Sequence, residues 1–512
     1  MKKPRGKSGL FGVGVSRLCA VAAARTARQM ARLVRVGARE TPTIEVRLDW
    51  LRSDVEREHF LRWLAKNAPR RVTLLATCRR RAGGGKLGGS VQRELYWLKR
   101  AREVGCGWCD LEVETYGHLP RQSWRDLGLP PRLLLSLHDF KSTPARFALN
   151  GRATEKCAAV KIAAKARTIG DSVRLLHLAR RARNVVAVPM GDLGLPARIL
   201  ALREGSQLAY APVGEATAPG QVSLHELKHL YRAQDLTQLT RVYGVIGDPI
   251  AHSLSPVLHN AGFIARGIDA VYLPFLVKNL SDFLKVIPAF DLRGFSVTIP
   301  HKQAILRHLD ECEPLAAEIG AVNTVKVRRD GSLFGCNTDY EGVLRALKGK
   351  MTLRGAQVLI FGAGGSARAA AFALAKVGAA VSICARRERA AGELADAVGG
   401  QAIARQTLAR HRFDAVLNTT PIGMHPKDKA SPLNSNELNC RLVMDLVYHP
   451  ETTQLLKIAA RRGIATVSGV EMFLAQGFAQ FEIWTGRRAP ESAMRRAALR
   501  ALRAKEKSGL RH

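Results

Sequence analysis

A lysine and a histidine in the first half of the chain have the types and spacing needed for amine chemistry. Lys161 lies inside the apolar run Ala158–Ala163, where a charged side chain is costly and is kept either for a structural pair or for a reaction. His138 ends another apolar run 23 residues earlier, which fits one strand–helix unit. Neighbouring strands lie about 5 Å apart, so we expect the imidazole and the amine to be neighbours. Two interpretations remain open: an imine-forming lysine with an acid–base histidine, or a buried polar pair without a catalytic role.

An imine-forming lysine must be neutral when it attacks a carbonyl. At its reference pKa a lysine is neutral only about once in a few thousand molecules at pH 7, so burial and nearby cations must lower that pKa. Arg47, Arg79 and Arg198 stand near the ends of candidate strands in the same half of the chain. We expect them to supply this positive field and to hold an anionic substrate.

A glycine turn in the second half has the pattern of a dinucleotide site. The apolar run 358–361 leads into Gly362, Gly364 and Ala367, and an alanine-rich helical pattern follows. Gly362 would allow the tight turn, Gly364 would let the backbone approach a pyrophosphate, and Ala367 would let the helix lie on the strand. The free N–H groups and the positive dipole end of the helix would face the phosphates. Such turns also connect strands to helices without any ligand.

The residues after the next candidate strand favour one dinucleotide over the other. That strand, 380–385, is followed by Arg386 and Arg387, where an NAD site usually has an acid for the ribose hydroxyl. Two arginines suit a 2′-phosphate, so the sequence predicts NADP as the cofactor.

Composition limits the classes of function. The chain has 512 residues, which favours two domains of roughly 200–280 residues each. No apolar run approaches the roughly 20 residues of a membrane span. The net charge of +37 could indicate nucleic acid, but basic residues are scattered and aromatic residues make up only 6% of the chain. We therefore predict anionic small-molecule substrates, no nucleic acid and no membrane.

The cysteines and the N-terminus bear on location. Nine cysteines at irregular spacing indicate reduced thiols and a cytoplasmic protein. Cys106 and Cys109 have redox or metal spacing, but no second pair follows, so we predict no metal site. Residues 1–16 are basic and lack a convincing cleavage site, which favours a loose tail over a signal peptide.

Strand and helix patterns alternate from residue 17 to about residue 210. Helical patterns such as 26–36, 55–66 and 90–104 separate the candidate strands. Eight strand–helix units without a dinucleotide glycine turn predict a closed (β/α)8 barrel over residues 17–232, with its site at the carboxyl ends of the strands. The candidate strands are Leu18–Ala22, Thr43–Leu48, Val72–Cys78, Cys109–Glu114, Leu133–His138, Ala158–Ala163, Val185–Pro189 and Ser206–Ala211.

The first half contains a set of motifs, most of them at or near the ends of these strands: Glu45-x-Arg47-x-Asp49, Arg79, Leu137–Phe140, Val160–Ala163, Gly191–Gly194 leading to Arg198, and Ala218–Gln221. As a set, they resemble type I 3-dehydroquinate dehydratase. The resemblance implies that Lys161 forms an imine with the substrate ketone and that His138 shuttles protons. It also implies that the substrate is bound by a group of polar residues. The implied substrate-binding residues are Glu45, Arg47, Arg79, Arg198, Thr217 and Gln221.

Two departures from that family stand out. Ala82 occupies the position before the glycine pair where the family commonly has a glutamate, and Thr217 stands where a serine is frequent. The missing acid could alter the pKa of His138.

The second half contains another set of motifs. Ser253-Leu-Ser255-Pro256 precedes a helical pattern, for which Ser255 is a candidate N-cap and Pro256 a candidate first residue, and the two hydroxyls could bind a carboxylate. Phe295–Lys302, Gly320–Thr324 and Gly335–Asp339 follow, then the glycine turn, Asn418–Met424 and Gly469–Met472 with Gln476.

Together these motifs resemble shikimate dehydrogenase over residues 241–500. The resemblance implies that Lys302 and Asp339 form the acid–base pair at a reducible carbonyl. Ser296 and Ala385 depart from the family, which has asparagine at both positions. The implied substrate-binding residues are Ser253, Ser255, Thr298, Asn323, Tyr448 and Gln476. The implied cofactor-binding residues are Gly362, Ala363, Gly364, Gly365, Ser366, Ala367, Arg386, Arg387, Thr419 and Gly469.

The fold class predicted is α/β, a barrel followed by a two-lobed unit. Its parts are a substrate region at 242–346, a Rossmann NADP region at 354–475, and C-terminal helices at 476–503 that return to the substrate region. The two resemblances imply consecutive steps of aromatic biosynthesis: dehydration of 3-dehydroquinate to 3-dehydroshikimate, then its reduction with NADPH to shikimate. The alternatives are a quinate-preferring dehydrogenase, a catalytically silent sensor of these ligands, and a protein that binds nucleic acid by charge.

Overall fold

The structure is a computed structural model. It describes residues 16–117, 132–147, 157–182, 184–214, 221–251, 253–425 and 427–509. The chain divides into two compact units. One contains the described part of Met1–Thr240 together with Phe275–Phe290, and the other contains the described parts of Arg241–Pro274 and Asp291–His512. The predicted basic tail, apart from Ser16, and Thr217 lie outside the described residues.

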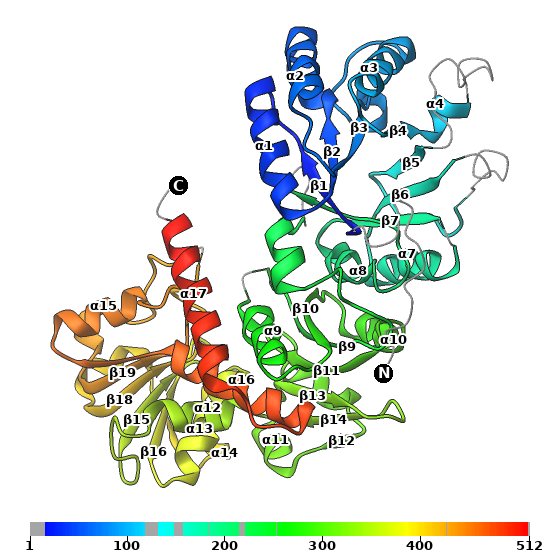
Figure 1. Cartoon of the computed structure of the whole chain (residues 1–512). Helices are drawn as coiled ribbons and strands as arrows, with labels where there is room; N and C mark the ends of the chain where they lie inside the picture. The colour runs from blue at the N-terminus through cyan, green and yellow to red at the C-terminus, as the bar shows by residue number, and fades with distance from the viewer. Residues whose placement is uncertain are drawn as a thin grey trace. The chain divides into compact units, whose positions relative to one another are not determined.

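The first unit is built around eight parallel strands in the order β7-β6-β5-β4-β3-β2-β1-β8 (Figure 1). These strands are β1 (Leu18–Ala22), β2 (Thr43–Arg47), β3 (Thr73–Thr77), β4 (Trp108–Glu112), β5 (Leu133–Asp139), β6 (Ala159–Lys165), β7 (Val185–Met190) and β8 (Ala209–Pro212). The prediction of eight parallel strands is confirmed, but full closure is not, because β7 and β8 form no ladder. Gln207 N–H donates to Val185 O at 2.9 Å, and Ala187 N–H donates to Ser206 Oγ at 3.1 Å, so loop contacts bridge the seam.

Helices cover the outside of this barrel. Thr26, Ser53, Ser90 and Thr168 each accept a backbone N–H with the side-chain oxygen, which explains why α1, α2, α3 and α7 begin where they do. The strand expected at 109–114 ends early, because the backbone turns into α4 after Glu112. The helices are α1 (Ala27–Glu40), α2 (Asp54–Asn67), α3 (Val91–Glu103), α4 (Val113–Gly117), α7 (Ile169–Arg181) and α8 (Leu195–Leu200).

The second unit contains a mixed sheet in the order β10-β9-β11-β13-β14-β12. β11 runs parallel to β9 and antiparallel to β13. The strands are β9 (Arg241–Gly247), β10 (Ala270–Leu276), β11 (Leu292–Val297), β12 (Glu311–Cys312), β13 (Thr324–Val327) and β14 (Leu333–Cys336). The helices of this region are α9 (Ser255–Ala265), α11 (Pro314–Ile319) and α12 (Asp339–Leu347). The helix α10 (Leu280–Phe290) follows β10 in the chain but belongs to the first unit.

The last two helices, α16 (Gly469–Thr485) and α17 (Glu491–Gly509), belong to the second unit. Phe481 of α16 packs against Phe263 of α9 with ring centroids 5.6 Å apart. Trp484 Nε1–H donates to Val325 O of β13 at 3.0 Å. The C-terminal segment therefore returns to the mixed sheet, and its first helix starts seven residues earlier than the sequence pattern indicates.

A second sheet of this unit is fully parallel, in the order β17-β16-β15-β18-β19-β20. The order reverses between β15 and β18, which is the switch point where doubly wound sheets bind ligands. Alternate residues of β15 pack into different cores, Val358 and Ile360 into one and Leu359 and Phe361 into the other. The elements are β15 (Gln357–Phe361), α13 (Gly365–Lys376), β16 (Ala380–Cys384), α14 (Glu388–Ala397), β17 (Gln401–Ala402), β18 (Phe413–Asn418), β19 (Cys440–Asp445), α15 (Gln454–Arg461) and β20 (Ala465–Ser468).

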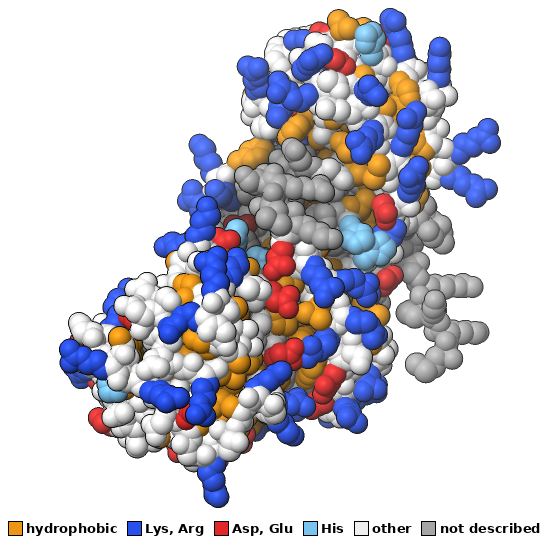
Figure 2. Space-filling view, turned by 90° about the vertical axis from the view of Figure 1, so that its left-hand side faces the viewer, with side chains coloured by type: hydrophobic (Ala, Val, Ile, Leu, Met, Phe, Trp, Pro, Cys, Tyr) orange, Lys and Arg blue, Asp and Glu red, His pale blue; other side chains and the backbone are white. Residues whose placement is uncertain are grey.

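Basic side chains are spread over the face seen in Figure 2, mixed with acidic and apolar ones, rather than gathered in one stripe. Among the helices that the structure describes, none has both the length and the apolar character to cross a bilayer.

Candidate active sites

The first site follows from the two-residue period of the barrel strands. Leu75, Trp108, Leu134 and Ala159 lie on four successive strands and pack into one apolar cluster inside the barrel. Side chains two residues further along each strand point to the same side. Those positions are polar, and they form a buried layer above the apolar one: Thr77, Asp110, Ser136 and Lys161.

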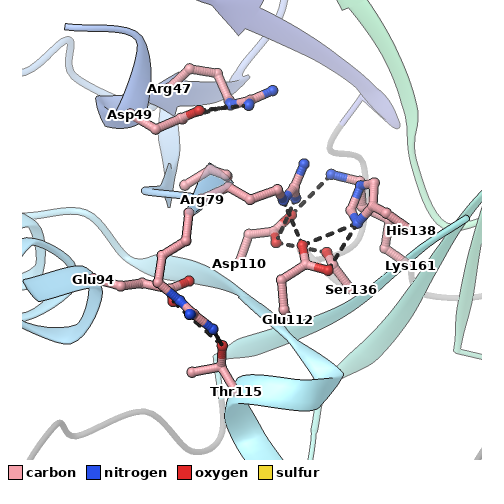
Figure 3. Close-up of polar contacts among 12 residues, drawn as sticks. Arg47, Asp49, Arg79, Glu94, Asp110, Glu112, Thr115, Ser136, His138 and Lys161 are labelled. Carbon is pink, nitrogen blue, oxygen red and sulfur yellow. Dashed lines mark hydrogen bonds and ion pairs between the residues drawn. The ribbon is translucent and has the colours of Figure 1, made fainter. Parts of the chain in front are cut away.

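Lys161 lies in this layer among carboxylates. Its Nζ is 2.9 Å from Asp110 Oδ2 (Figure 3). It is also 3.7 Å from Glu45 Oε1 and 4.4 Å from the centroid of the Tyr210 ring. Only 5% of Lys161 is exposed. The ion partners that the structure gives this amine are carboxylates, and Arg79, one of the three predicted cations, is bound to the same Asp110 as Lys161. Burial opposes ionisation of Asp110, but Lys161 and Arg79 together hold the pKa of this carboxyl below its usual value.

His138 occupies the next step along β5. Ser136 is the register partner of Lys161 on β6, so His138 lies two residues closer to the carboxyl end of the barrel. Its Nδ1 is 3.0 Å from Glu112 Oε1 and 3.2 Å from Oε2. Burial lowers the pKa of His138, and the positive charge of Arg79 acts in the same direction, so a neutral imidazole is favoured at pH 7.

The three predicted arginines have different partners. Arg79 Nε donates to Glu112 Oε1 at 2.5 Å, and its Nη2 donates to Asp110 Oδ1 at 3.0 Å. Arg47 donates to both oxygens of Asp49 at 2.9 Å.

Arg198 donates through Nε and Nη2 to Pro189 O at 3.1 and 2.7 Å. Burial lowers the pKa of Arg198 to about 10. Gln221 is half-buried just after a stretch that lies outside the described residues.

Sequence reasoning missed Asp110 and Glu112. The signal was present, because acids at alternate positions of the apolar strand Trp108–Glu112 must share one face. An acid pair of that kind inside a buried strand is as unusual as the lysine that was noticed.

The second site lies on the second unit. Lys302 Nζ is 2.5 Å from Asp339 Oδ2 and 3.1 Å from Ser366 Oγ. Asn323 Nδ2 donates to Asp339 Oδ1 at 2.8 Å. Asp339 is the first residue of α12, where the positive end of the helix dipole favours a carboxylate. The structure thus brings together the two residues that the resemblance paired and adds Ser366 of the glycine turn.

The remaining predicted substrate residues lie on several elements of the same unit. Ser255 is not the N-cap of α9: it is the first helical residue, Leu254 precedes it, and its N–H donates to Ser253 Oγ at 3.2 Å. Burial raises the pKa of Tyr448, and a hydrogen bond with Ser253 acts against that rise. Gln476 donates to Phe473 O at 2.8 Å, and Thr298 is half-buried directly after β11.

The departure at Ser296 has a structural counterpart. Ser296 Oγ donates to Gln480 Oε1 at 2.7 Å, and Gln480 Nε2 donates to Asn323 O at 3.2 Å and to Thr324 Oγ1 at 3.0 Å. Gln480 is 1% exposed. Gln480 of α16 thus connects Ser296 of β11 to the segment that carries Asn323.

The glycine turn fits a dinucleotide. Gly362 has φ +128°, which favours glycine, and Thr419 Oγ1 donates to Phe361 O at 2.9 Å beside it. Gly364 precedes α13 without a side-chain cap, and a Cβ built on it would meet no atom within 4 Å, so its backbone is open to a phosphate. Ala367 is completely buried.

The other residues predicted to bind the dinucleotide differ in exposure. Ala363, Gly365 and Ser366 are half-buried, whereas Arg386 and Arg387 are exposed. A Cβ on Gly469 would lie 2.5 Å from Leu446 O, so only glycine fits at the start of α16. In the described part of the chain, no three His, Cys, Asp or Glu side chains are grouped as metal ligands.

A parallel barrel with a buried lysine and histidine, joined to a Rossmann-type unit with a lysine–aspartate pair beside its glycine turn, defines an enzyme that combines lyase and dinucleotide-dependent oxidoreductase chemistry. A family model described as type I 3-dehydroquinase matches residues 18–238. Models for the shikimate dehydrogenase substrate binding domain and the shikimate 5′-dehydrogenase C-terminal domain match residues 245–325 and 469–499.

Proteins similar to this chain include a bifunctional enzyme and single-function dehydrogenases. The chain is 35% identical over 474 residues to the chloroplastic bifunctional 3-dehydroquinate dehydratase/shikimate dehydrogenase of Arabidopsis thaliana, covering 88% of this chain and 78% of that protein. It is 43% identical over 282 residues to the shikimate dehydrogenase (NADP(+)) of Methanothermobacter thermautotrophicus, covering 52% of this chain and 99% of that protein. The crystal structure of shikimate 5-dehydrogenase from Thermus thermophilus, in complex with NADP(H) and shikimate, is 37% identical and covers 51% of this chain and 100% of that one, with a TM-score of 0.48. The chain belongs to the bifunctional 3-dehydroquinate dehydratase/shikimate dehydrogenase family.

Proposed function

We propose that the barrel dehydrates 3-dehydroquinate through an imine on Lys161 and that the second unit reduces the resulting 3-dehydroshikimate to shikimate with NADPH. The observation that carries this proposal is that both reactive pairs are complete in one chain. Lys161 lies with Asp110 below His138, and Lys302 lies against Asp339. A silent sensor would have no need to retain four reactive groups in two buried sites.

In the barrel, Lys161 Nζ adds to the ketone carbon, and loss of water gives the imine. The imine withdraws electrons, so His138 can remove a proton from the adjacent carbon to give an enamine. The enamine expels the hydroxyl group on the next carbon, which leaves as water with the proton that His138 returns. Hydrolysis of the imine then releases the enone and regenerates Lys161.

Several residues of the barrel would bind the substrate in this reaction. Arg198 and Gln221 would hold its carboxylate and hydroxyls, with Arg47 and Glu45 along the wall. Arg79 is ion-paired with two carboxylates, Asp110 and Glu112, and through them it would hold the catalytic groups in place. Thr217 stays a sequence-based prediction.

In the second unit, Lys302 would donate the proton that turns the ketone into an alcohol. Asp339 keeps the ammonium in place at 2.5 Å, and the positive charge also stabilises the developing alkoxide. Substrate hydroxyls and the carboxylate would be bound by a set of polar residues around this pair: Ser253, Ser255, Thr298, Asn323, Tyr448 and Gln476.

NADPH, when bound, supplies the hydride. The open backbone of Gly364 and the N-terminus of α13 would hold the pyrophosphate, while Arg386 and Arg387 would hold the 2′-phosphate. Ala363, Gly365, Ser366 and Thr419 would line the turn, with Ala367 and Gly469 providing close packing.

The domain boundaries that we propose are 17–232 for the barrel, 242–346 for the substrate region, 354–475 for the NADP region and 476–503 for the returning helices. We also propose a cytoplasmic location, because nine cysteines at irregular spacing in a long chain are typical of proteins from reducing compartments. The plant relative is chloroplastic, so localisation in the organism of origin decides this point.

One coupled assay tests the function. Purified protein given 3-dehydroquinate and NADPH should oxidise NADPH without any added enzyme, and the product should be shikimate. Lys161→Ala should oxidise NADPH only when 3-dehydroshikimate is supplied, and Lys302→Ala should accumulate 3-dehydroshikimate. Equal or faster turnover with quinate and NADP⁺ than with shikimate would favour the quinate-preferring alternative instead.

A further inference from the structure

Glu112 is buried at the carboxyl end of β4, on the inner face of the barrel. It is 6% exposed, and Figure 3 shows its carboxylate between His138 and Arg79. One oxygen lies 3.0 Å from His138 Nδ1 and accepts a 2.5 Å hydrogen bond from Arg79 Nε. Buried carboxylates are costly unless they are fully paired, and this one has both partners at the reacting histidine.

We propose that Glu112 is the positioning residue of His138: its carboxylate accepts a hydrogen bond from Nδ1–H, which keeps the proton on Nδ1 and leaves Nε2 as the free base that removes and returns the substrate proton. The inference rests on the proposed role of His138 and adds a residue to the dehydration reaction. It also assigns Arg79 the task of orienting Glu112.

Geometry restricts His138 to this partner. On its other side the imidazole stacks on Phe140, with ring centroids 5.8 Å apart and planes 19° from parallel. The loop after β3 carries no acid from Arg80 to Gly89, and Ala82 stands where the family commonly has a glutamate. Gly83 lies so close to Glu112 that a Cβ there would be 3.1 Å from Glu112 Cγ. The carboxylate that the loop lacks is therefore provided from the strand.

The same contacts connect the two reacting side chains. Glu112 is bound to Arg79, Arg79 Nη2 donates to Asp110 Oδ1 at 3.0 Å, and Asp110 Oδ2 is 2.9 Å from Lys161 Nζ. Ser136 Oγ also donates to Asp110, at 2.6 Å. Each carboxylate thus fixes one reacting group, and Arg79 fixes the distance between the carboxylates.

The charges around His138 give a distinguishing signature. Besides burial, the positive charges of Arg79, two residues after β3, and of Lys161 on β6 lower the pKa of His138, whereas Glu112 on β4 raises it. Asp110 on β4 adds a further negative charge nearby. Removing the charge of Glu112 should therefore lower the pKa of His138 further. The acid limb of kcat/KM, which reports a base in the free enzyme, should then move to lower pH.

The test compares Glu112→Gln with Glu94→Gln in the full chain. Glu94 is a matched control because it is buried, 1% exposed, and paired with Arg80 at 2.9 Å, but it has no contact with His138. For Glu112→Gln we expect kcat of dehydration to fall about 10²-fold, with KM within about threefold of wild type. We also expect the acid limb of the pH profile of kcat/KM to move to lower pH. Glu112→Asp should keep the limb close to the wild-type position. Glu94→Gln should leave kcat within about threefold and the limb unmoved.

Three results would overturn the proposal. The first is dehydration by Glu112→Gln within about twofold of wild type. The second is an equal loss in Glu94→Gln and Glu112→Gln with both limbs unmoved, since that would mean a structural role only. The third does not depend on the Glu112 variants folding: nitrogen NMR of the wild-type protein, with the His138 signals identified by their loss in His138→Gln, should show the proton on Nδ1 at pH 7. A proton on Nε2 would refute the assignment.

Discussion

Replacing Lys302 with alanine should abolish reduction of 3-dehydroshikimate and also weaken the second unit. Deleting a group that donates a proton in the transition state costs roughly 10²–10⁴-fold in rate. Dehydration by the barrel should stay near its wild-type level, because Lys161 has no described contact with Lys302. Binding of NADPH should also change little, because Lys302 is bound to the glycine turn by one hydrogen bond, to Ser366 Oγ at 3.1 Å, and has no described contact with Arg386. The assay is the loss of NADPH absorbance with 3-dehydroshikimate as substrate.

The cost in stability follows from what the variant leaves behind. The Lys302 and Asp339 side chains are 13% and 6% exposed, so alanine leaves a nearly buried carboxylate without its cation. Breaking a buried pair in this way costs about 3–5 kcal/mol. Here we expect about 3 kcal/mol, because Asn323 still donates to Asp339 at 2.8 Å and Lys302 is partly solvated.

A double variant separates the two effects. Lys302→Ala with Asp339→Asn removes the stranded charge, so it should recover most of the unfolding free energy, measured by urea titration, and none of the reductase activity. Lys326→Ala, at an exposed lysine of β13, is the control and should change neither quantity. If Lys302→Ala reduces the substrate within about threefold of wild type, or if the double variant regains turnover, the proton donor is another residue.

Three further predictions concern other parts of the chain. Borohydride with 3-dehydroquinate should leave one covalent adduct, at Lys161; an adduct that persists in Lys161→Ala would assign the imine to another amine. Arg386→Ala should lose about 1.5–3 kcal/mol, ten- to hundredfold, in NADPH affinity with little change for NADH, and an equal loss for both cofactors in a binding titration would mean that the arginine is structural. Burial raises the pKa of Asp445 from 3.8 to about 6, so the folded protein binds an extra proton between these values and this contribution to stability is lost as pH rises through 6. Between pH 5 and pH 8 the wild type should therefore lose about 1.4 kcal/mol relative to Asp445→Asn; parallel pH profiles of the two proteins would contradict the burial argument.

Periodicity and turn chemistry explain how much of the fold the sequence predicts. The strand Leu18–Ala22 was placed to the residue, and the other barrel strands to within about three residues, because buried parallel strands are short apolar runs between polar segments. Thr26, Ser53 and Ser90 mark helix starts by the hydrogen bonds that they make locally. The glycine turn is equally local, since its conformation depends on Gly362 itself.

The environment of each reacting group was decided by the tertiary structure. Lys161 and Asp110 are 51 residues apart and meet only because β4 and β6 point their inner faces into the same barrel. The sequence identified the unusual lysine and predicted cations near it, but it did not predict the carboxylates of Asp110 and Glu45, which strand tilt and register place beside the amine. Which residues face one another across a barrel depends on the stagger between strands, and no local pattern in the chain encodes that stagger.

The same reasoning applies to the seam and to α9. A closed barrel needs backbone hydrogen bonds that pair β7 with β8, and these two strands are not paired in the structure. Each of the two strands is nevertheless present close to its predicted position. Ser255 has the residue type of an N-cap, but the backbone enters the helix one residue earlier, at Leu254. Residue types and short spacings thus determined the elements and the reactive side chains of this enzyme. The side chains that contact those reactive residues were decided by the tertiary structure, because charged groups from distant strands become neighbours only when the strands pack together.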